Sequence, residues 1–190
     1  MSSLSERFPK KSTIFGTTMF LNEYNRIYIP KNKEGFEKTI DALFSLLPDP
    51  NDEQKKNYML IKKYPFILPK NNFDLGLSND YNFNYTILDH MPNGWRTKFG
   101  AKLLKELKEA ILEYKEDFLY EYFVSQVKEK WGGLRWYDYG STERMRKVLD
   151  KYSKISYKIC IVCGKKGKID KGYSWVMPLC RRHRKARKRG

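Results

Sequence analysis

Three stretches of the chain place apolar residues at the spacing of an amphipathic helix. The first lies between residues 34 and 47 and has the apolar face Phe36, Ile40, Leu43, Phe44 and Leu47. The second follows Thr97, the expected N-cap, and has the apolar face Phe99, Leu103, Leu104, Leu107, Ala110, Ile111 and Tyr114. The third follows Ser141, also an expected N-cap, and has the apolar face Met145, Val148, Leu149, Tyr152 and Ile155. Because each face recurs every three or four residues, all three stretches predict helices that bury one side.

Strand-forming residues predict two antiparallel hairpins. Residues 13–20 and 26–29 are rich in Thr, Ile, Phe and Tyr, with a loose turn between them. Residues 119–128 and 134–138 form the second hairpin, in which the adjacent Gly132 and Gly133 supply the positive φ angles of a tight turn. The alternation of this hairpin puts Leu134 and Trp136 on one face and Arg135 and Tyr137 on the other.

The remaining segments divide the chain into an α+β protein of three parts. Residues 48–53 have a loop composition, and residues 58–84 are predicted to be irregular. Within them, residues 64–69 contain two prolines and predict an edge strand or an extended segment at best, and residues 71–84 predict a loop. We therefore expect an N-terminal hairpin and helix over residues 1–50, a central domain over residues 51–157, and a C-terminal module over residues 158–190.

The composition excludes several classes of protein. Hydrophobic residues make up 41% of the chain, which is enough for a packed core, so disorder throughout is not expected. No apolar run approaches the ~18 residues of a membrane span, and residues 1–9 lack the apolar core of a signal peptide. We therefore expect neither secretion nor membrane contact. Three cysteines fit a reducing compartment and a metal site better than a disulfide framework.

The net charge of +16 is concentrated at the C-terminal end. Residues 151–190 contain 14 basic residues and one acidic residue, Asp170. Such a block attracts phosphates, although a solvated tail that only aids solubility is the alternative. The candidate binding residues are Arg181, Arg182, Arg184, Lys185, Arg187, Lys188, Arg189, Lys165 and Lys166. Arg135 and Tyr137 of the second hairpin are further candidates, because they could stack on unpaired bases or contact a protein partner.

Cysteine and histidine occur at metal-ligand spacing near the same end. Cys160 and Cys163 are followed by Cys180 and His183, with two residues inside each pair. Four such ligands suit a tetrahedral Zn²⁺ ion, and because protein fills every position we expect structural zinc. A knuckle, a hairpin and a helix whose first turn supplies the last two ligands form the treble-clef arrangement. The alternative is that the cysteines are ordinary buried residues.

A second motif is similar to part of a nuclease site. Asp89-His90-Met91-Pro92 is similar to the Asp-His-x-x-Pro strand of His-Asn-His nucleases, in which a histidine activates water beside Mg²⁺. In that family the catalytic histidine lies between the two halves of the treble clef, whereas residues 164–179 contain no histidine. We therefore expect no catalytic residue. His90 and Asp89 are the candidates if the protein is instead a metal-dependent nuclease.

The second hairpin and the cysteine pairs together resemble a known group of proteins. Gln126–Tyr137 (QVKEKWGGLRWY), a helix, and then Cys160-x-x-Cys-Gly and Leu179-Cys-x-x-His resemble small zinc-binding proteins of phages and prophages. Members of that group have Val-Lys-Glu-Lys-Phe-Gly-x-Leu-Arg-Phe-Tyr before similar ligand pairs. The resemblance covers roughly residues 64–183. It implies a phage setting and a zinc site, and no established activity.

These features lead to one expected function and two alternatives. We expect a phage-encoded, non-enzymatic zinc protein that binds nucleic acid or a host nucleoprotein complex through its basic end. The resemblance implies that it acts in the cytoplasm of the host bacterial cell. Interference with a host defence protein, for example CRISPR-type machinery, follows from that setting alone. The alternatives are the His90 nuclease and a protein-directed inhibitor whose basic tail only steers association.

Overall fold

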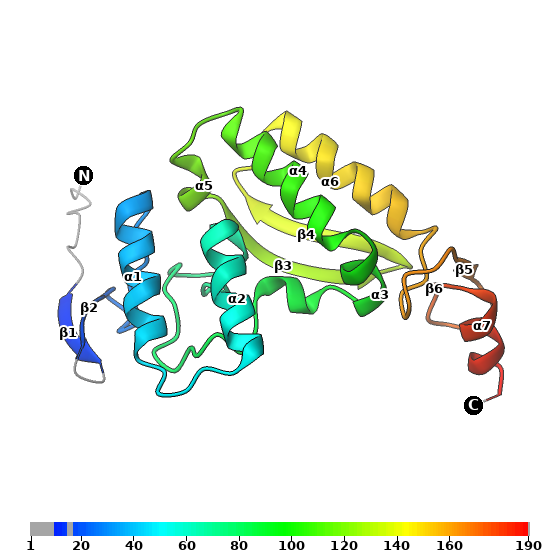
Figure 1. Cartoon of the computed structure of the whole chain (residues 1–190). Helices are drawn as coiled ribbons and strands as arrows, with labels where there is room; N and C mark the ends of the chain where they lie inside the picture. The colour runs from blue at the N-terminus through cyan, green and yellow to red at the C-terminus, as the bar shows by residue number, and fades with distance from the viewer. Residues whose placement is uncertain (1–9, 15–16, 190) are drawn as a thin grey trace.

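The computed structural model describes residues 10–14 and 17–189, and these form the predicted α+β mixture (Figure 1). Its elements in chain order are β1 (Lys10–Ile14), β2 (Thr17–Leu21), α1 (Lys33–Ser45), α2 (Asp52–Lys63), η1 (Pro65–Ile67), η2 (Ile87–His90), α3 (Asn93–Trp95), η3 (Arg96–Gly100), α4 (Ala101–Leu112), α5 (Phe118–Glu121), β3 (Phe123–Lys130), β4 (Gly133–Tyr139), α6 (Glu143–Ser156), β5 (Lys168–Asp170), β6 (Met177–Leu179) and α7 (Arg181–Arg187). The strands form three separate antiparallel pairs, β1–β2, β3–β4 and β5–β6. Within this part of the chain, no helix has the length and apolar character needed to cross a bilayer. Residues 1–9, for which the sequence predicts no signal peptide, lie outside the described part.

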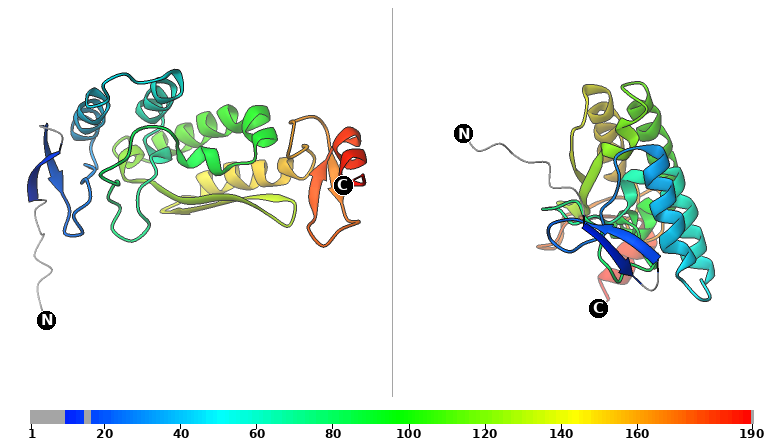
Figure 2. Two further views of the ribbon diagram at one scale, coloured as in Figure 1. Left: turned by 90° about the horizontal axis from the view of Figure 1, so that it is seen from below. Right: turned by 90° about the vertical axis from the view of Figure 1, so that its left-hand side faces the viewer.

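The β3–β4 hairpin occupies the centre of the molecule, with α4 and α6 side by side across one of its faces (Figures 1 and 2). Leu103, Leu104 and Leu107 of α4 are buried there, as are Met145 and Val148 of α6. An isolated two-stranded hairpin is marginally stable in water, so the two helices supply the apolar partner that it needs. The predicted apolar faces of both helices are confirmed except at Tyr114, which follows the end of α4 and is exposed.

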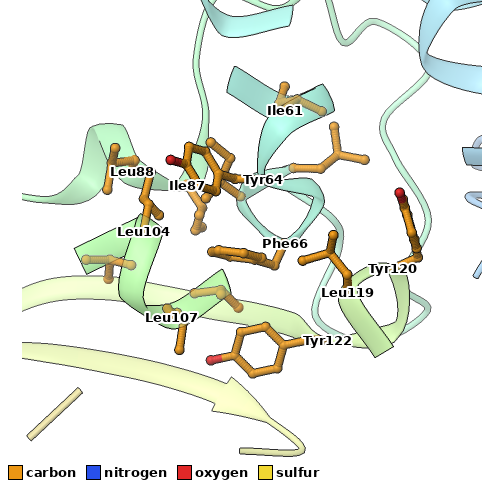
Figure 3. Packing of buried hydrophobic residues seen from close by; sticks show 14 of the residues in the cluster. Ile61, Tyr64, Phe66, Ile87, Leu88, Leu104, Leu107, Leu119, Tyr120 and Tyr122 are labelled. Atoms are coloured by element: carbon orange, nitrogen blue, oxygen red, sulfur yellow. The ribbon is translucent and has the colours of Figure 1, made fainter. Parts of the chain in front are cut away.

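One cluster of buried side chains joins this centre to α1 and α2. It includes Ile40 of α1, Ile61 of α2 and Tyr122, which precedes β3. Phe66 of η1 lies between α2 and the segment that leads into β3, and its ring centroid is 5.7 Å from that of Tyr122 (Figure 3). The core therefore continues across residue 50, where the sequence analysis divides the chain.

The first hairpin differs from its prediction. Strand β2 pairs along its whole length with β1, residues 26–29 form no strand beside it, and the turn residues 15 and 16 lie outside the described ones. Residues 26–29 contribute only isolated bridges, from Ile27 to Leu21 and to Leu77. Asn25 turns the chain before them with a φ angle of 58°, a conformation that asparagine tolerates better than most residues. The predicted loop at residues 71–84 is confirmed.

Two segments that were predicted to be irregular or extended are helical. Residues 58–63 belong to α2, which begins at a capping box formed by Asn51 and Gln54. Residues 65–67 form the 3₁₀ turn η1 instead of an extended segment. Pro65 occupies the first position of this turn, where its missing N–H group has no helical acceptor to lose.

Both predicted N-caps in the second half are wrong. The helical stretch that leads into α4 begins after Pro92, whose carbonyl accepts hydrogen bonds from Trp95 and Arg96, so Thr97 lies inside it. Helix α6 is capped by Thr142, because the Ser141 hydroxyl instead donates to the Asp138 carboxylate at 2.6 Å. A side-chain oxygen can cap a helix only when the backbone places it over the first turn.

The second hairpin forms as predicted, with two differences. Residues 118–121 form the short helix α5, so β3 begins at Phe123. The positive φ angles of its turn belong to Trp131 (55°) and Gly132 (76°), whereas Gly133 begins β4. Leu134 is buried and Trp136 packs partly against the core, as the alternation predicts.

Residues 158–189, which we call the C-terminal module, contact the central part through main-chain atoms. The N–H of Gly94 donates to the carbonyl of Ile161 at 2.9 Å, and the indole N–H of Trp95 donates to the carbonyl of Ile159 at 2.9 Å. A Cβ atom on Gly94 would lie 2.2 Å from the carbonyl oxygen of Cys160. Only glycine therefore permits this approach.

Gly94→Ala is expected to destabilise the protein, because the added methyl group would overlap main-chain atoms of the C-terminal module. We expect a loss of about 1–3 kcal/mol in the free energy of unfolding, measured by urea denaturation. Gly100→Ala is the matched control. Its Cβ would have no heavy atom closer than 3.6 Å, so the helix should gain about 0.5–1 kcal/mol. Equal midpoints for the two variants would contradict the prediction.

Candidate metal centre and basic helix

The four predicted metal ligands come together in the C-terminal module. The ligand atoms of Cys160, Cys163, Cys180 and His183 all lie within 4.8 Å of one another, and no second such group occurs among the described residues. The Nδ1 atom of His183 is 3.3 Å from the Sγ atoms of Cys160 and Cys180, and the Sγ atoms of Cys163 and Cys180 are 3.8 Å apart. Sulfur and nitrogen ligands of a tetrahedral ion are about 3.4–3.8 Å apart, given the usual bond lengths. The four side chains fit a single metal ion.

Local main-chain geometry places these ligands. The N–H of Gly164 donates to the carbonyl of Cys160 at 3.0 Å, and the N–H of Cys160 donates to the carbonyl of Lys165 at 2.7 Å, which closes a tight knuckle. Gly164 has a φ angle of 71°, which a side chain would strain. Cys180 is the N-cap of α7, and His183 lies in the first turn of that helix. The knuckle, the hairpin β5–β6 and the helix follow in the predicted order.

The pKa values of Cys180 and Cys163 are shifted in opposite directions by their surroundings. A hydrogen bond from the backbone N–H of His183 lowers the pKa of Cys180. The backbone N–H of Lys165 acts in the same direction on Cys163, but burial and the neighbouring thiols outweigh it and raise the pKa of Cys163. Thiolates this close repel one another, and a coordinated cation removes that penalty by holding them in the deprotonated form.

Five basic residues of the C-terminal helix and the residues after it are exposed. They are Arg181, Arg182, Lys185, Lys188 and Arg189, which we call the α7 basic face. No acidic residue in the described part of the chain pairs with any of them. Lys165 and Lys166, in the segment that follows the knuckle, are exposed as well. This surface is the largest local concentration of the predicted binding residues.

Arg184 and Arg187 have a different environment, because both point into the C-terminal module. Arg184 donates to a main-chain carbonyl at the end of β6 at 3.2 Å. Arg187 donates to the carbonyl of Trp175 at 2.6 Å, and its guanidinium lies 4.1 Å from the ring centroid of Tyr173. Its Nη1 atom is 3.8 Å from the carboxylate of Asp170, a side chain that is only 9% exposed. These contacts give the two arginines a packing role between α7 and the β5–β6 hairpin.

Arg135 and Tyr137 lie on β4, away from the α7 basic face in the sequence, and both have partners within the protein. Arg135 donates to the hydroxyl of Tyr157 at 3.2 Å and to the carbonyl of Leu134 at 3.1 Å. The ammonium group of Lys128 lies 5.2 Å from the ring centroid of Tyr137. A base that stacks on Tyr137 would have to share or displace this cation.

Asp89 and His90 do not belong to the metal cluster. One carboxylate oxygen of Asp89 accepts hydrogen bonds from the N–H and the hydroxyl of Thr86, at 2.7 and 3.0 Å, and the other pairs with Arg96. Asp89 thereby caps the η2 turn and ties it to the helical stretch that follows. His90 is exposed at the end of that turn.

Sequence reasoning did not identify the roles of Asp170 and Gly94. Asp170 is the single acidic residue among 14 basic ones in residues 151–190, and that isolation is a usable signal for a buried partner. Gly94 has no comparable signal, because a close approach to residues 160–164 is a property of the fold.

Arg187→Gln is expected to destabilise the C-terminal module, because it leaves the Asp170 carboxylate without its cation and removes the cover of the Tyr173 ring. We expect a loss of about 1–3 kcal/mol, measured by thermal unfolding of the metal-loaded protein. Arg189→Gln is the control, since Arg189 is exposed, and its effect should stay within about 0.5 kcal/mol. The same stability for both variants would refute a packing role.

Comparison with known proteins gives no relative of this chain. No model of a protein family matches it, and no match is found among curated proteins or solved structures. The resemblance to the phage group therefore stays a prediction. The metal ligands and the basic helix are the features from which a function can be argued.

Proposed function

We propose that this is a non-enzymatic zinc protein that binds nucleic acid through the α7 basic face. The observation that carries the proposal is the division of charge at this end of the chain. Arg184 and Arg187 are used in packing, whereas five further cations face solvent without acidic partners among the described residues. Lysine and arginine side chains in such a group bind phosphates and release condensed counterions, which gives affinity without regard to sequence.

Zinc is the ion that best suits the donor set. Three cysteines and one histidine offer soft and borderline ligands, whereas Mg²⁺ and Ca²⁺ require oxygen ligands that this cluster lacks. Protein side chains would fill all four positions, so the ion would act in folding and leave no coordination site for a substrate. The ion would join the knuckle, which contains Cys160 and Cys163, to the first turn of α7, which contains His183.

The identity of the bound nucleic acid is inferred from the resemblance to phage proteins. Under that resemblance, the nucleic acid belongs to a bacterial host, either free or within a nucleoprotein complex such as a nucleic-acid-guided defence system. The nuclease alternative has less support, because both carboxylate oxygens of Asp89 are already bonded within the protein. Cleavage that depends on Mg²⁺ and is lost in His90→Ala would favour that alternative.

Purified protein is expected to contain one zinc ion per chain, measured by native mass spectrometry and elemental analysis. Removing it with a chelator should expose the amides of residues 158–189 to hydrogen exchange, while those of α4, β3 and α6 remain protected. The reason is that metal binding supplies much of the folding free energy of so small a module. Cys163→Ser should lose the metal and show the same exchange pattern. Unchanged protection after complete removal of the metal would refute a structural role.

Neutralising part of the α7 basic face is expected to weaken binding to nucleic acid. The variant is Lys185→Gln, Lys188→Gln and Arg189→Gln together, and all three side chains are exposed. For duplex DNA, the slope of log affinity against log salt should become shallower by about 0.9 for each phosphate that the variant no longer neutralises. Fluorescence anisotropy over a series of salt concentrations measures both the affinity and the slope.

The control variant removes the same charge from the opposite end of the molecule. Lys33, Lys55 and Lys56 are exposed on α1 and α2, far from α7 (Figures 1 and 2). Their replacement by glutamine should leave the salt slope nearly unchanged. If the two triple variants weaken binding equally, overall charge and not the α7 basic face attracts the nucleic acid. Binding to a protein target that survives nuclease treatment would instead favour the protein-directed inhibitor.

A further inference from the structure

Two exposed tryptophans line one pocket where the β3–β4 hairpin meets the C-terminal module. Trp131 at the tip of the hairpin is 67% exposed, and Trp175 before β6 is 63% exposed. The pocket has a volume of about 400 Å³, within the range of small-ligand sites. Its lining consists of Glu129, Lys130, Trp131, Ser174, Trp175 and Val176.

The two tryptophan rings differ from most other exposed rings in their partners. Most of the other exposed aromatic side chains contact a second ring or a cation, namely Tyr24, Phe73, Tyr85, Tyr114, Tyr137, Tyr139 and Tyr173. Among the described residues, neither Trp131 nor Trp175 has such a contact. Phe20 also lacks one, but it lies on β2 at the opposite end of the molecule (Figure 1). Two largely exposed indole rings with neither a ring nor a cation partner therefore line a single pocket.

A carboxylate fixes the two sides of the pocket relative to each other. Glu129 accepts a hydrogen bond from the N–H of Gly132 at 2.5 Å and another from the indole N–H of Trp175 at 3.0 Å. A Cβ atom on Gly132 would lie 2.6 Å from the Cδ1 atom of Ile169, so the tip of β3–β4 is in close contact with β5. Because the site is formed before any ligand arrives, binding requires little ordering.

The backbone at Trp131 is strained in a way that burial does not compensate. Trp131 has a φ angle of 55° in a two-residue turn, a position that favours Asn, Asp or Gly. A large side chain in this conformation is unusual, and its ring remains mostly in solvent. Residues held in sparsely populated conformations cluster at ligand sites. The turn therefore holds the ring at the mouth of the pocket, where a ligand can reach it.

We propose that this pocket binds an unpaired base of single-stranded nucleic acid, which stacks on Trp131 and Trp175. The proposal rests on the proposed function and names its substrate class. Aromatic side chains bind successive bases of single strands by stacking, without reading sequence, and bases inside a duplex cannot reach such a site. Lys130 lines the same pocket and can pair with a backbone phosphate beside the stacked base, while both oxygens of Glu129 are already bonded to N–H donors of the protein.

The test compares three probes of equal length with the full-length, zinc-loaded protein. They are single-stranded oligothymidylate, an abasic strand with the same phosphates, and a duplex. We expect oligothymidylate to bind about tenfold more tightly than the abasic strand. In Trp131→Ala and in Trp175→Ala this ratio should fall below about twofold, with the affinity for the abasic strand unchanged. Phe20→Ala, which removes a free ring at the other end, should keep the ratio.

A second variant separates stacking from structure. Trp175→Phe loses the hydrogen bond to Glu129 but keeps an aromatic face, so it should retain most of the preference for oligothymidylate. Zinc content and thermal unfolding confirm that each variant is folded. A preference that survives in both alanine variants, or a wild-type protein that binds oligothymidylate and the abasic strand equally, overturns the stacking site alone. Failure to bind all three probes overturns the proposed function as well.

Discussion

Two glycines in contact hold the metal module against the rest of the molecule. Gly94 and Gly164 approach so closely that a Cβ atom on Gly164 would lie 2.7 Å from the carbonyl oxygen of Gly94. At the same place, hydrogen bonds join Gly94 to Ile161 and Trp95 to Ile159. At the glycines, main-chain atoms meet on both sides, and they cannot adjust by changing rotamer as side chains do. Together with the contact between the tip of β3–β4 and the β5–β6 hairpin, this glycine contact sets the position of the module.

Within the C-terminal module, each element is held in place by the one before it in the chain. The knuckle leads into the β5–β6 hairpin, and the metal ligands Cys180 and His183 hold the beginning of α7. Arg187, at the other end of α7, links this helix to the carbonyl of Trp175 and to the carboxylate of Asp170. A helix of seven residues is too short to be stable in water by itself. Attachment at both ends is therefore what turns a basic tail into an ordered surface.

The parts of the fold that could be predicted from the sequence are those whose residues recur at short, regular intervals along the chain. The apolar faces of α1, α4 and α6 and the two ligand pairs follow from intervals of three or four residues. Helix α2 could not be found in this way, because its buried face contains Gln54 and Asn57. These side chains donate to the carbonyls of Asn82 and Phe83, each at 2.8 Å. Because this helix uses polar side chains to bond the carbonyl groups of a loop, its buried face does not show a repeating pattern of apolar residues.

Local spacing also fails to predict which residues form the proposed binding surface. A count of charges cannot separate the packing residue Arg187 from the exposed Arg189, since that difference is one of helical direction. The pairing of Trp175 with Glu129 could not be predicted either, because the two residues are 46 positions apart in the chain.

The α7 basic face and the tryptophan pocket also respond differently to salt concentration. Attraction between exposed charges is screened beyond about 8 Å at physiological salt, whereas stacking on an indole is not. Under the proposed function, the α7 basic face would attract a nucleic-acid strand at physiological salt, and stacking in the tryptophan pocket would decide whether that strand stays bound.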